Sequence, residues 1–175
     1  MAEITLAQGV SATLSAGKVI IKGPLGSNER QFNDALLKVE INGSKVKVEP
    51  SPANKKLAKK AMVAEQSLAK ELSNDSEGVV KYFEVNMEAV YAHFPLTIEV
   101  KPKEIIIKNM LGERYPRYSG IVGKTKVEIK GNDITISGTS KDDVSQTAAN
   151  LRKASKIRKK DERIFQDGVY YAVEV

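Results

Sequence analysis

The chain has 175 residues, of which 41% are hydrophobic and 29% charged, as in an ordinary globular protein of one or two small domains. It contains no cysteine, which excludes a disulfide framework, a thiolate metal site and a thiol nucleophile. No signal-peptide pattern opens the sequence and no apolar run approaches the length of a membrane span, so we expect a protein of a reducing compartment with no membrane span.

The first half of the chain predicts strands, a hairpin and a helix, in that order. Residues 11–14 and 18–22 alternate weakly around a turn at Ala16 and Gly17. Apolar residues then alternate on both sides of Asn42-Gly43-Ser44, which predicts a hairpin over residues 39–48. Ser51 followed by Pro52 predicts the start of a helix. Its apolar stripe comprises Leu57, Ala61, Ala64, Leu68 and Leu72.

The second half predicts the same succession. A strand from residue 79 to about 92 leads into it and ends before Phe94 and Pro95. A second hairpin is predicted over residues 127–136, and a second helix begins at Ser140, with Asp143 as its capping-box partner. The apolar stripe of this helix comprises Val144, Ala148, Leu151 and Ala154. A last strand follows a turn at residues 167–168.

The two halves also share sequence. Residues 18–26 return at 104–112, residues 38–49 at 126–137 and residues 77–85 at 167–175, with 14 identities in 30 compared positions. A period near 88 residues is the size of one small domain. We therefore expect an α+β protein built from two tandem copies of one domain, residues 1–82 and 83–175. Each copy is predicted to pack one helix on a mostly antiparallel sheet.

Residues that could carry catalysis lack the partners they would need. His93 is the only histidine and is interpreted as a structural or turn residue. Asp142 and Asp143 fall in the first turn of a helix, where acids interact favourably with the helix dipole. Residues 120–125 resemble the end of a phosphate loop but lack its first glycine and its helix. We predict no catalytic residue, cofactor, metal or small-molecule substrate.

Positive charge is concentrated in the second half. The net charge is +6; residues 1–80 carry 11 Lys/Arg against 9 Asp/Glu, and residues 81–175 carry 17 against 13. Seven of those 17 cations lie between Arg152 and Arg163, beside only two acids. Such a cluster creates a field that attracts polyanions.

Two segments suit RNA. In residues 112–120, two arginines that can contact phosphates alternate with two tyrosines that can stack on bases, although a solvated loop with its tyrosines on the sheet is equally consistent. In residues 152–170, the basic run favours a phosphate-contacting surface over a solvated face, and Phe165 is predicted to pack under the turn at 167–168. The predicted RNA-binding residues are Lys108, Arg114, Arg117, Tyr118, Lys124, Arg152, Lys153, Lys156, Arg158, Lys159, Lys160, Arg163 and Tyr170.

Four segments resemble one protein family. Residues 22–26 (Lys-Gly-Pro-Leu-Gly), followed by Arg30 and Phe32, resemble the first-domain signature of large ribosomal subunit protein six. Residues 92–95, 109–114 and 163–170 resemble signatures of its archaeal and eukaryotic branch. The resemblance covers essentially the whole chain, including the duplication.

This resemblance implies a cytoplasmic structural constituent of the large ribosomal subunit with a role in translation. It implies binding to large-subunit (23S-type) ribosomal RNA, mainly through the second domain, near the translation-factor binding region and the stalk base. Neighbouring ribosomal proteins are the implied protein partners, with translation factors nearby. A free-standing RNA-binding or RNA-remodelling module outside the ribosome is the alternative, whereas an enzyme would have no site in this sequence.

Overall fold

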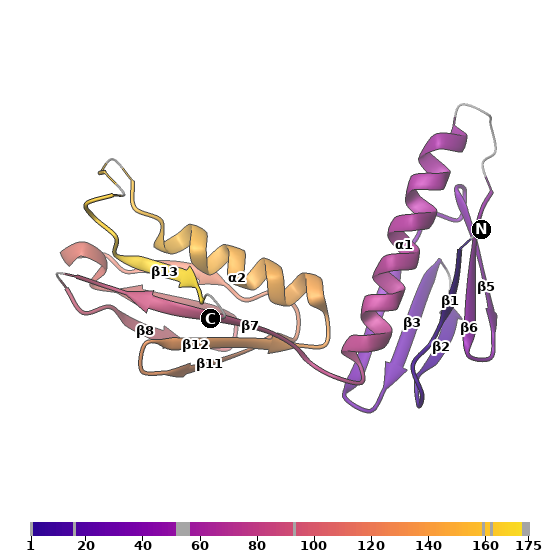
Figure 1. Ribbon diagram of the computed structural model, residues 1–175, viewed down its shortest axis with the longest axis horizontal. Helices are drawn as coiled ribbons and strands as arrows, with labels where there is room; N and C mark the ends of the chain where they lie inside the picture. The colour runs from indigo at the N-terminus through magenta and orange to yellow at the C-terminus, as the bar shows by residue number, and fades with distance from the viewer. Residues whose placement is uncertain are drawn as a thin grey trace. The chain divides into compact units, whose positions relative to one another are not determined.

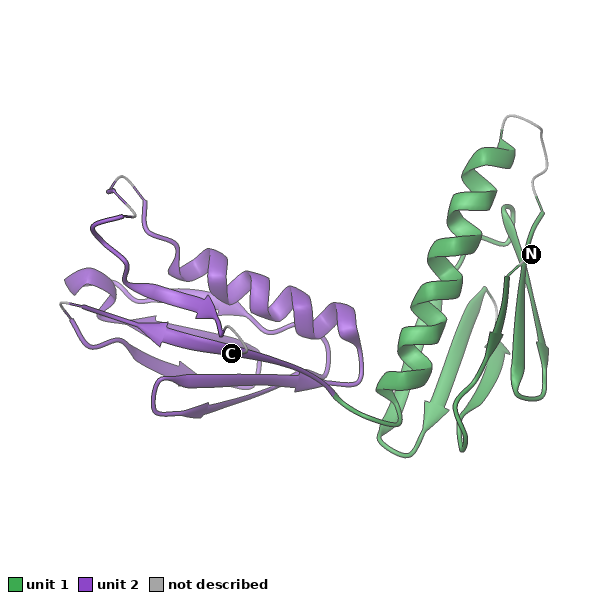
Figure 2. Cartoon of the chain, viewed as in Figure 1, with its two compact units in different colours: residues 1–82 green, residues 83–175 purple. Residues whose placement is uncertain are grey.

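A computed structural model describes residues 2–15, 17–51, 57–92, 94–158, 160–161 and 163–172. The chain divides into two compact units, Met1–Tyr82 and Phe83–Val175 (Figure 2). Each unit has its own hydrophobic core. The predictions for Ala16, Pro52, His93 and Lys159 concern positions outside the described residues.

The first unit packs one helix against two antiparallel sheets (Figure 1). Its helix α1 spans Ala58–Gly78, and its sheets have the strand orders β1-β6-β5 and β2-β3-β4. The strands are β1 (Ala2–Thr5), β2 (Ser11–Ser15), β3 (Lys18–Gly23), β4 (Gly26–Gln31), β5 (Leu37–Asn42) and β6 (Lys45–Pro50).

The second unit again packs one helix, α2 (Lys141–Ser155), against two antiparallel sheets. The sheets have the strand orders β10-β9-β8 and β11-β12-β7-β13. A short 3₁₀ turn, η2 (Met110–Gly112), follows β9. The strands are β7 (Phe83–Val90), β8 (Thr97–Val100), β9 (Glu104–Lys108), β10 (Arg117–Gly120), β11 (Lys126–Lys130), β12 (Asp133–Gly138) and β13 (Gly168–Tyr171). The protein is therefore of the α+β class, as predicted.

Both predicted hairpins form with two-residue turns. In the first, Asn42 pairs with Lys45, and Gly43 in the turn has φ +61°. In the second, Lys130 pairs with Asp133, and Gly131 has φ +64°. A positive φ is readily adopted by glycine, which explains why the turn chemistry identified these hairpins from sequence.

Strand registers correspond between the units. Val39 pairs with Val48, and the residues 88 positions later, Val127 and Ile136, also pair. Ser11 pairs with Lys22, and the residues 86 positions later, Thr97 and Lys108, also pair. The second unit has three more residues between equivalent paired positions of these strands, because Ile21 pairs with Asn28, seven positions later, and Ile107 pairs with Arg117, ten positions later.

The predicted helix stripes supply much of both cores. Ala61, Leu68 and Leu72 of α1 are buried in the first unit, and Val144, Ala148 and Leu151 of α2 in the second. Ser140 caps α2 as predicted, since its Oγ accepts a hydrogen bond from the Asp143 backbone N–H at 3.3 Å. Helix α1 begins at Ala58, after residues 52–56, which include the predicted start at Pro52.

The strand predicted from residue 79 is wrong at its start. Helix α1 continues to Gly78, and β7 begins only at Phe83. The last turns of α1 are held by Asp75, which is buried and accepts hydrogen bonds from Arg30 at 2.6 and 3.1 Å. A buried carboxylate of this kind requires a hydrogen-bonded charge partner, so the pair ties the end of α1 to β4.

Val79 is a core residue at the end of this helix, not part of a strand. It is fully buried, and its carbonyl oxygen accepts a hydrogen bond from the Leu25 N–H at 3.0 Å. A Cβ atom at Gly23 would lie 2.6 Å from Val79 Cγ2, which explains the glycine in residues 22–26. Tertiary contacts therefore override the β propensity of residues 79–80.

Candidate nucleic-acid interface

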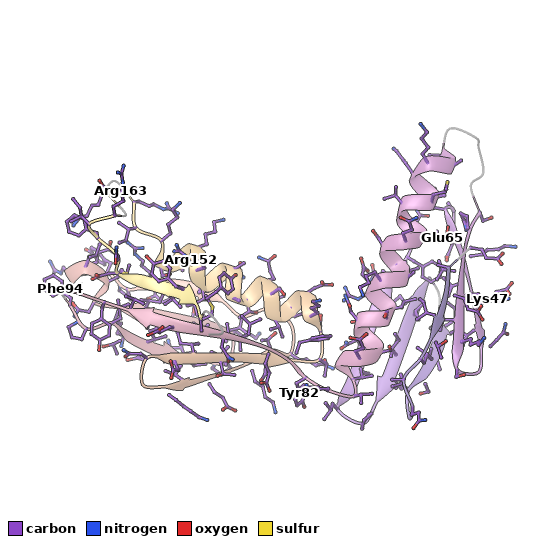
Figure 3. All side chains as sticks on the ribbon, viewed as in Figure 1. Lys47, Glu65, Tyr82, Phe94, Arg152 and Arg163 are labelled. Carbon is purple, nitrogen blue, oxygen red and sulfur yellow. The ribbon has the colours of Figure 1, made fainter. Side chains whose placement is uncertain are left out.

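Most of the predicted RNA-binding cations lie around the C-terminal end of α2 and the connection to β13. Arg152 and Lys153 occupy the last turn of α2, and the helix ends where Lys156 adopts φ −61° and ψ +130°. Cations in this position interact favourably with the negative end of the helix dipole. The exposed side chains beyond the helix include Lys156, Arg158, Lys160 and Arg163. Figure 3 shows Arg152 on α2 and Arg163 in the connection beyond it.

Two residues that the sequence analysis did not single out hold this connection in place. Ser155 is buried; its Oγ donates a hydrogen bond to the Arg152 carbonyl oxygen and accepts one from the Val169 N–H, both at 3.1 Å. Ile157 is buried in the core of the unit. These contacts fix the path of the chain between its exposed cations. The sequence signal that could have identified them is that Ser155 and Ile157 interrupt a run of basic residues.

Arg117 is committed to the protein itself. Its Nη1 donates to the carbonyl oxygens of Ala154 and Lys156, at 3.0 and 2.8 Å. Its Nε and Nη2 donate to the two carboxylate oxygens of Glu113, at 2.8 and 2.5 Å. The arginine thus satisfies carbonyl groups at the end of α2, which a helix leaves without intrahelical partners.

The ion pair also changes the titration of both groups. The hydrogen bond from Arg117 lowers the pKa of the Glu113 carboxyl below its ordinary value, although burial opposes this shift. The same hydrogen bond raises the pKa of the Arg117 guanidinium. Both groups therefore remain charged at neutral pH, and the contact between β10 and the end of α2 is charge-assisted.

The tyrosines of residues 112–120 do not rest on the sheet. Tyr115 is 78% exposed and Tyr118 is 59% exposed. The alternative interpretation, a loop whose tyrosines pack against the sheet, is therefore wrong for both. The segment is also not entirely a loop, because Arg117 and Tyr118 belong to β10.

The structure brings several predicted residues together on either side of α2. Tyr118, Lys153 and Arg158 line a depression of about 410 Å³ between β10 and α2. Arg152 and Tyr170 line a second depression of about 390 Å³, where the guanidinium carbon of Arg152 lies 4.4 Å from the centre of the tyrosine ring. Such a cation–π contact holds the arginine in a defined position.

The remaining predicted cations are distributed more widely. Lys108 lies on β9, with its Nζ 2.6 Å from Glu99 Oε1. Arg114 is exposed after η2, and Lys124 is exposed before β11.

Lys160 lies over the ring of Phe165, 4.6 Å from its centre. Phe165 itself is only partly buried against the core, so its predicted packing is incomplete.

Within the described ranges, no three His, Cys, Asp or Glu side chains are grouped to hold a metal ion. No helix in the described part of the chain is long and apolar enough to cross a membrane.

Comparison with known proteins identifies the family. The family model described as Ribosomal protein L6 matches residues 94–168. The protein named large ribosomal subunit protein uL6 from Methanosarcina mazei is 44% identical over 167 residues, covering 95% of this chain and 93% of the relative. The uL6 proteins of Methanobrevibacter smithii and Picrophilus torridus are 42% and 41% identical, and each match covers 92% of the relative's length. The chain belongs to the ribosomal protein L6 family.

Proposed function

We propose that this protein is a structural, non-enzymatic constituent of the cytoplasmic large ribosomal subunit that binds large-subunit ribosomal RNA. The family supports this role, because the relatives that match nearly the whole chain are named as large-subunit proteins. The observation that carries the RNA-binding part is the group of exposed cations and tyrosines around the end of α2. The proposed partners are ribosomal RNA and neighbouring ribosomal proteins.

The second unit, residues 83–175, is proposed as the main RNA-binding half. Lys and Arg side chains neutralise phosphates and release counterions, while exposed aromatic rings stack on unpaired bases. The proposed contacts are made by the predicted set of residues, with one change. Because four of its five N–H donors are used by Glu113 and by carbonyl groups at the end of α2, Arg117 positions the surface instead of contacting phosphate.

A position in the ribosome near the translation-factor binding region and the stalk base is part of the same proposal. It rests on the family resemblance of the second half. The cations beside α2 would brace the RNA segments that form this region.

The two units are proposed to be copies of one ancestral domain, with boundaries 1–82 and 83–175. The matching registers support this proposal, since hairpin partners recur at an offset of 88 and sheet partners at an offset of 86. The units differ at one strand, because β13 adds a strand to a sheet of the second unit. The corresponding residues of the first unit, 78–81, contain the end of α1 and a turn instead.

Sedimentation of large subunits in a gradient after a high-salt wash tests the ribosomal role. The tagged full-length chain, expressed in cells of its own organism, should remain with the large subunit. Its footprint on ribosomal RNA should disappear when the chain is stripped from the subunit. If the chain instead leaves the subunit at low salt and is recovered with other RNA, it acts as a free-standing RNA-binding module.

A further inference from the structure

The depression between β10 and α2 has the composition of a nucleotide site. Its lining comprises Tyr118, Ser119, Gly120, Asn150, Lys153, Ala154 and Arg158, and its volume of about 410 Å³ is within the range of roughly 300–1,000 Å³ for small-ligand pockets. The ring of Tyr118 is largely exposed to solvent. An aromatic face beside cations can accept a base whose phosphates lie on the cations.

Two cations flank the same depression. Lys153 extends from the last turn of α2, and Arg158 follows the buried Ile157; both are exposed. No acidic side chain forms an ion pair with either of them in the described part of the chain. They are therefore available to pair with phosphate groups.

The walls of the depression are held together by the Arg117 contacts. Arg117 lies next to Tyr118 on β10 and donates to the carbonyl oxygen of Ala154, which itself lines the depression. Asn150 adds a second link across the same two elements, because its Nδ2 donates to the Gly120 carbonyl oxygen at 3.1 Å. The site is thus formed before any ligand arrives, which lowers the entropic cost of binding.

We propose that this depression binds one unpaired nucleotide of the RNA, with its base on the Tyr118 ring. Lys153 and Arg158 contact the phosphates on either side of that nucleotide. This inference rests on the proposed RNA-binding function and deepens it, because it assigns one surface to a single extruded base. The polar and cationic lining favours a nucleotide over an apolar protein segment.

The first test measures binding of full-length variants to large-subunit ribosomal RNA freed of protein. Tyr118→Ala should weaken binding about 5- to 150-fold, the effect of losing one base–aromatic stack, and should leave the salt dependence unchanged. Tyr118→Phe should bind like the wild type, because the ring is kept. Tyr171→Ala, at another exposed tyrosine of the same unit, is the control and should bind like the wild type.

The second test is chemical probing of the RNA in the complex. Chemical probing should locate one nucleotide that is protected by the wild type and becomes reactive with Tyr118→Ala.

The outcomes separate this inference from the proposed function. If the wild type does not bind the ribosomal RNA, the proposed function fails. If the wild type binds but Tyr118→Ala binds equally well, or is no weaker than Tyr171→Ala, the nucleotide site is refuted and the proposed function stands.

Discussion

Arg117 has contacts within the protein that its sequence context does not reveal. An arginine between Pro116 and Tyr118 is typical of a phosphate-binding residue, yet its guanidinium bridges Glu113 and the carbonyl oxygens at the end of α2. Sequence could not reveal this, because Ala154 and Lys156 are 37 and 39 positions away. These hydrogen bonds hold β10 rigidly against the end of α2, at the edge of the surface beside this helix.

The Glu113–Arg117 pair predicts a pH dependence of stability. Because the pKa of Glu113 is lowered in the folded protein, its contribution is present above the ordinary value of 4.5 and is lost as the pH falls through the lowered pKa. Glu113→Gln should reduce the free energy of unfolding at neutral pH by about 0.2–1 kcal/mol, as expected for a partly exposed pair. Urea unfolding at a series of pH values should show this difference disappearing in acid.

A double-mutant cycle provides the control for that measurement. In an Arg117→Gln background, Glu113→Gln should have no further effect at any pH, since the partner is already gone. A difference between wild type and Glu113→Gln that persists undiminished in strong acid would show that the ion pair is not its source.

At the scale of elements, sequence predicted those whose pattern is local. The two hairpins and both helix stripes follow from alternation, turn glycines and a 3.6-residue period. The polar strand β4 has no apolar alternation, so its sequence carries no strand signal, and it forms by pairing with β3. The depression beside Tyr118 was equally hidden, because it requires β10 and α2 to pack together.

The connection from α2 to β13 should contribute to stability through Phe165. Its ring is only partly buried against the core and is covered by Lys160, so Phe165→Ala should lower the free energy of unfolding by less than the roughly 3–5 kcal/mol of a fully buried phenylalanine. Ile164→Ala is the matched control, because Ile164 is 68% exposed, and should change stability by less than about 0.5 kcal/mol. Equal effects in chemical denaturation would contradict the packing assigned to Phe165.

The same connection should also bind phosphate groups. Replacing Lys156, Arg158 and Lys160 together by Gln should weaken binding to ribosomal RNA and reduce the slope of log affinity against log salt by about 0.7 to 0.9 for each phosphate that is no longer neutralised. Filter binding at several salt concentrations measures both quantities. Thermal unfolding should show the variant folded, since cations at a helix end contribute only about 0.3–1 kcal/mol each.

A matched triple variant makes this result specific. Lys59, Lys60 and Lys70 are exposed on α1, and their replacement by Gln removes the same charge from the first unit. This control should alter affinity and salt slope much less. Equal effects of the two triple variants would mean that only net charge matters, and the cations beside α2 would lose their assigned role.

For the whole molecule, the separate cores of the two units imply that function can be divided between them. The second unit contains both depressions beside α2 and all of the proposed RNA-binding residues. Residues 81–175 also carry 17 Lys/Arg against 13 Asp/Glu, compared with 11 against 9 in residues 1–80. We therefore assign most of the affinity for RNA to the second unit.

Comparing the affinities of fragments 1–82 and 83–175 for large-subunit ribosomal RNA with that of the full chain tests this assignment most directly. Circular dichroism should first establish that each fragment is folded. Fragment 83–175 should then retain most of the full-length affinity and most of its salt dependence, whereas fragment 1–82 should bind weakly. Binding by fragment 1–82 that equals or exceeds that of fragment 83–175 would contradict the assignment.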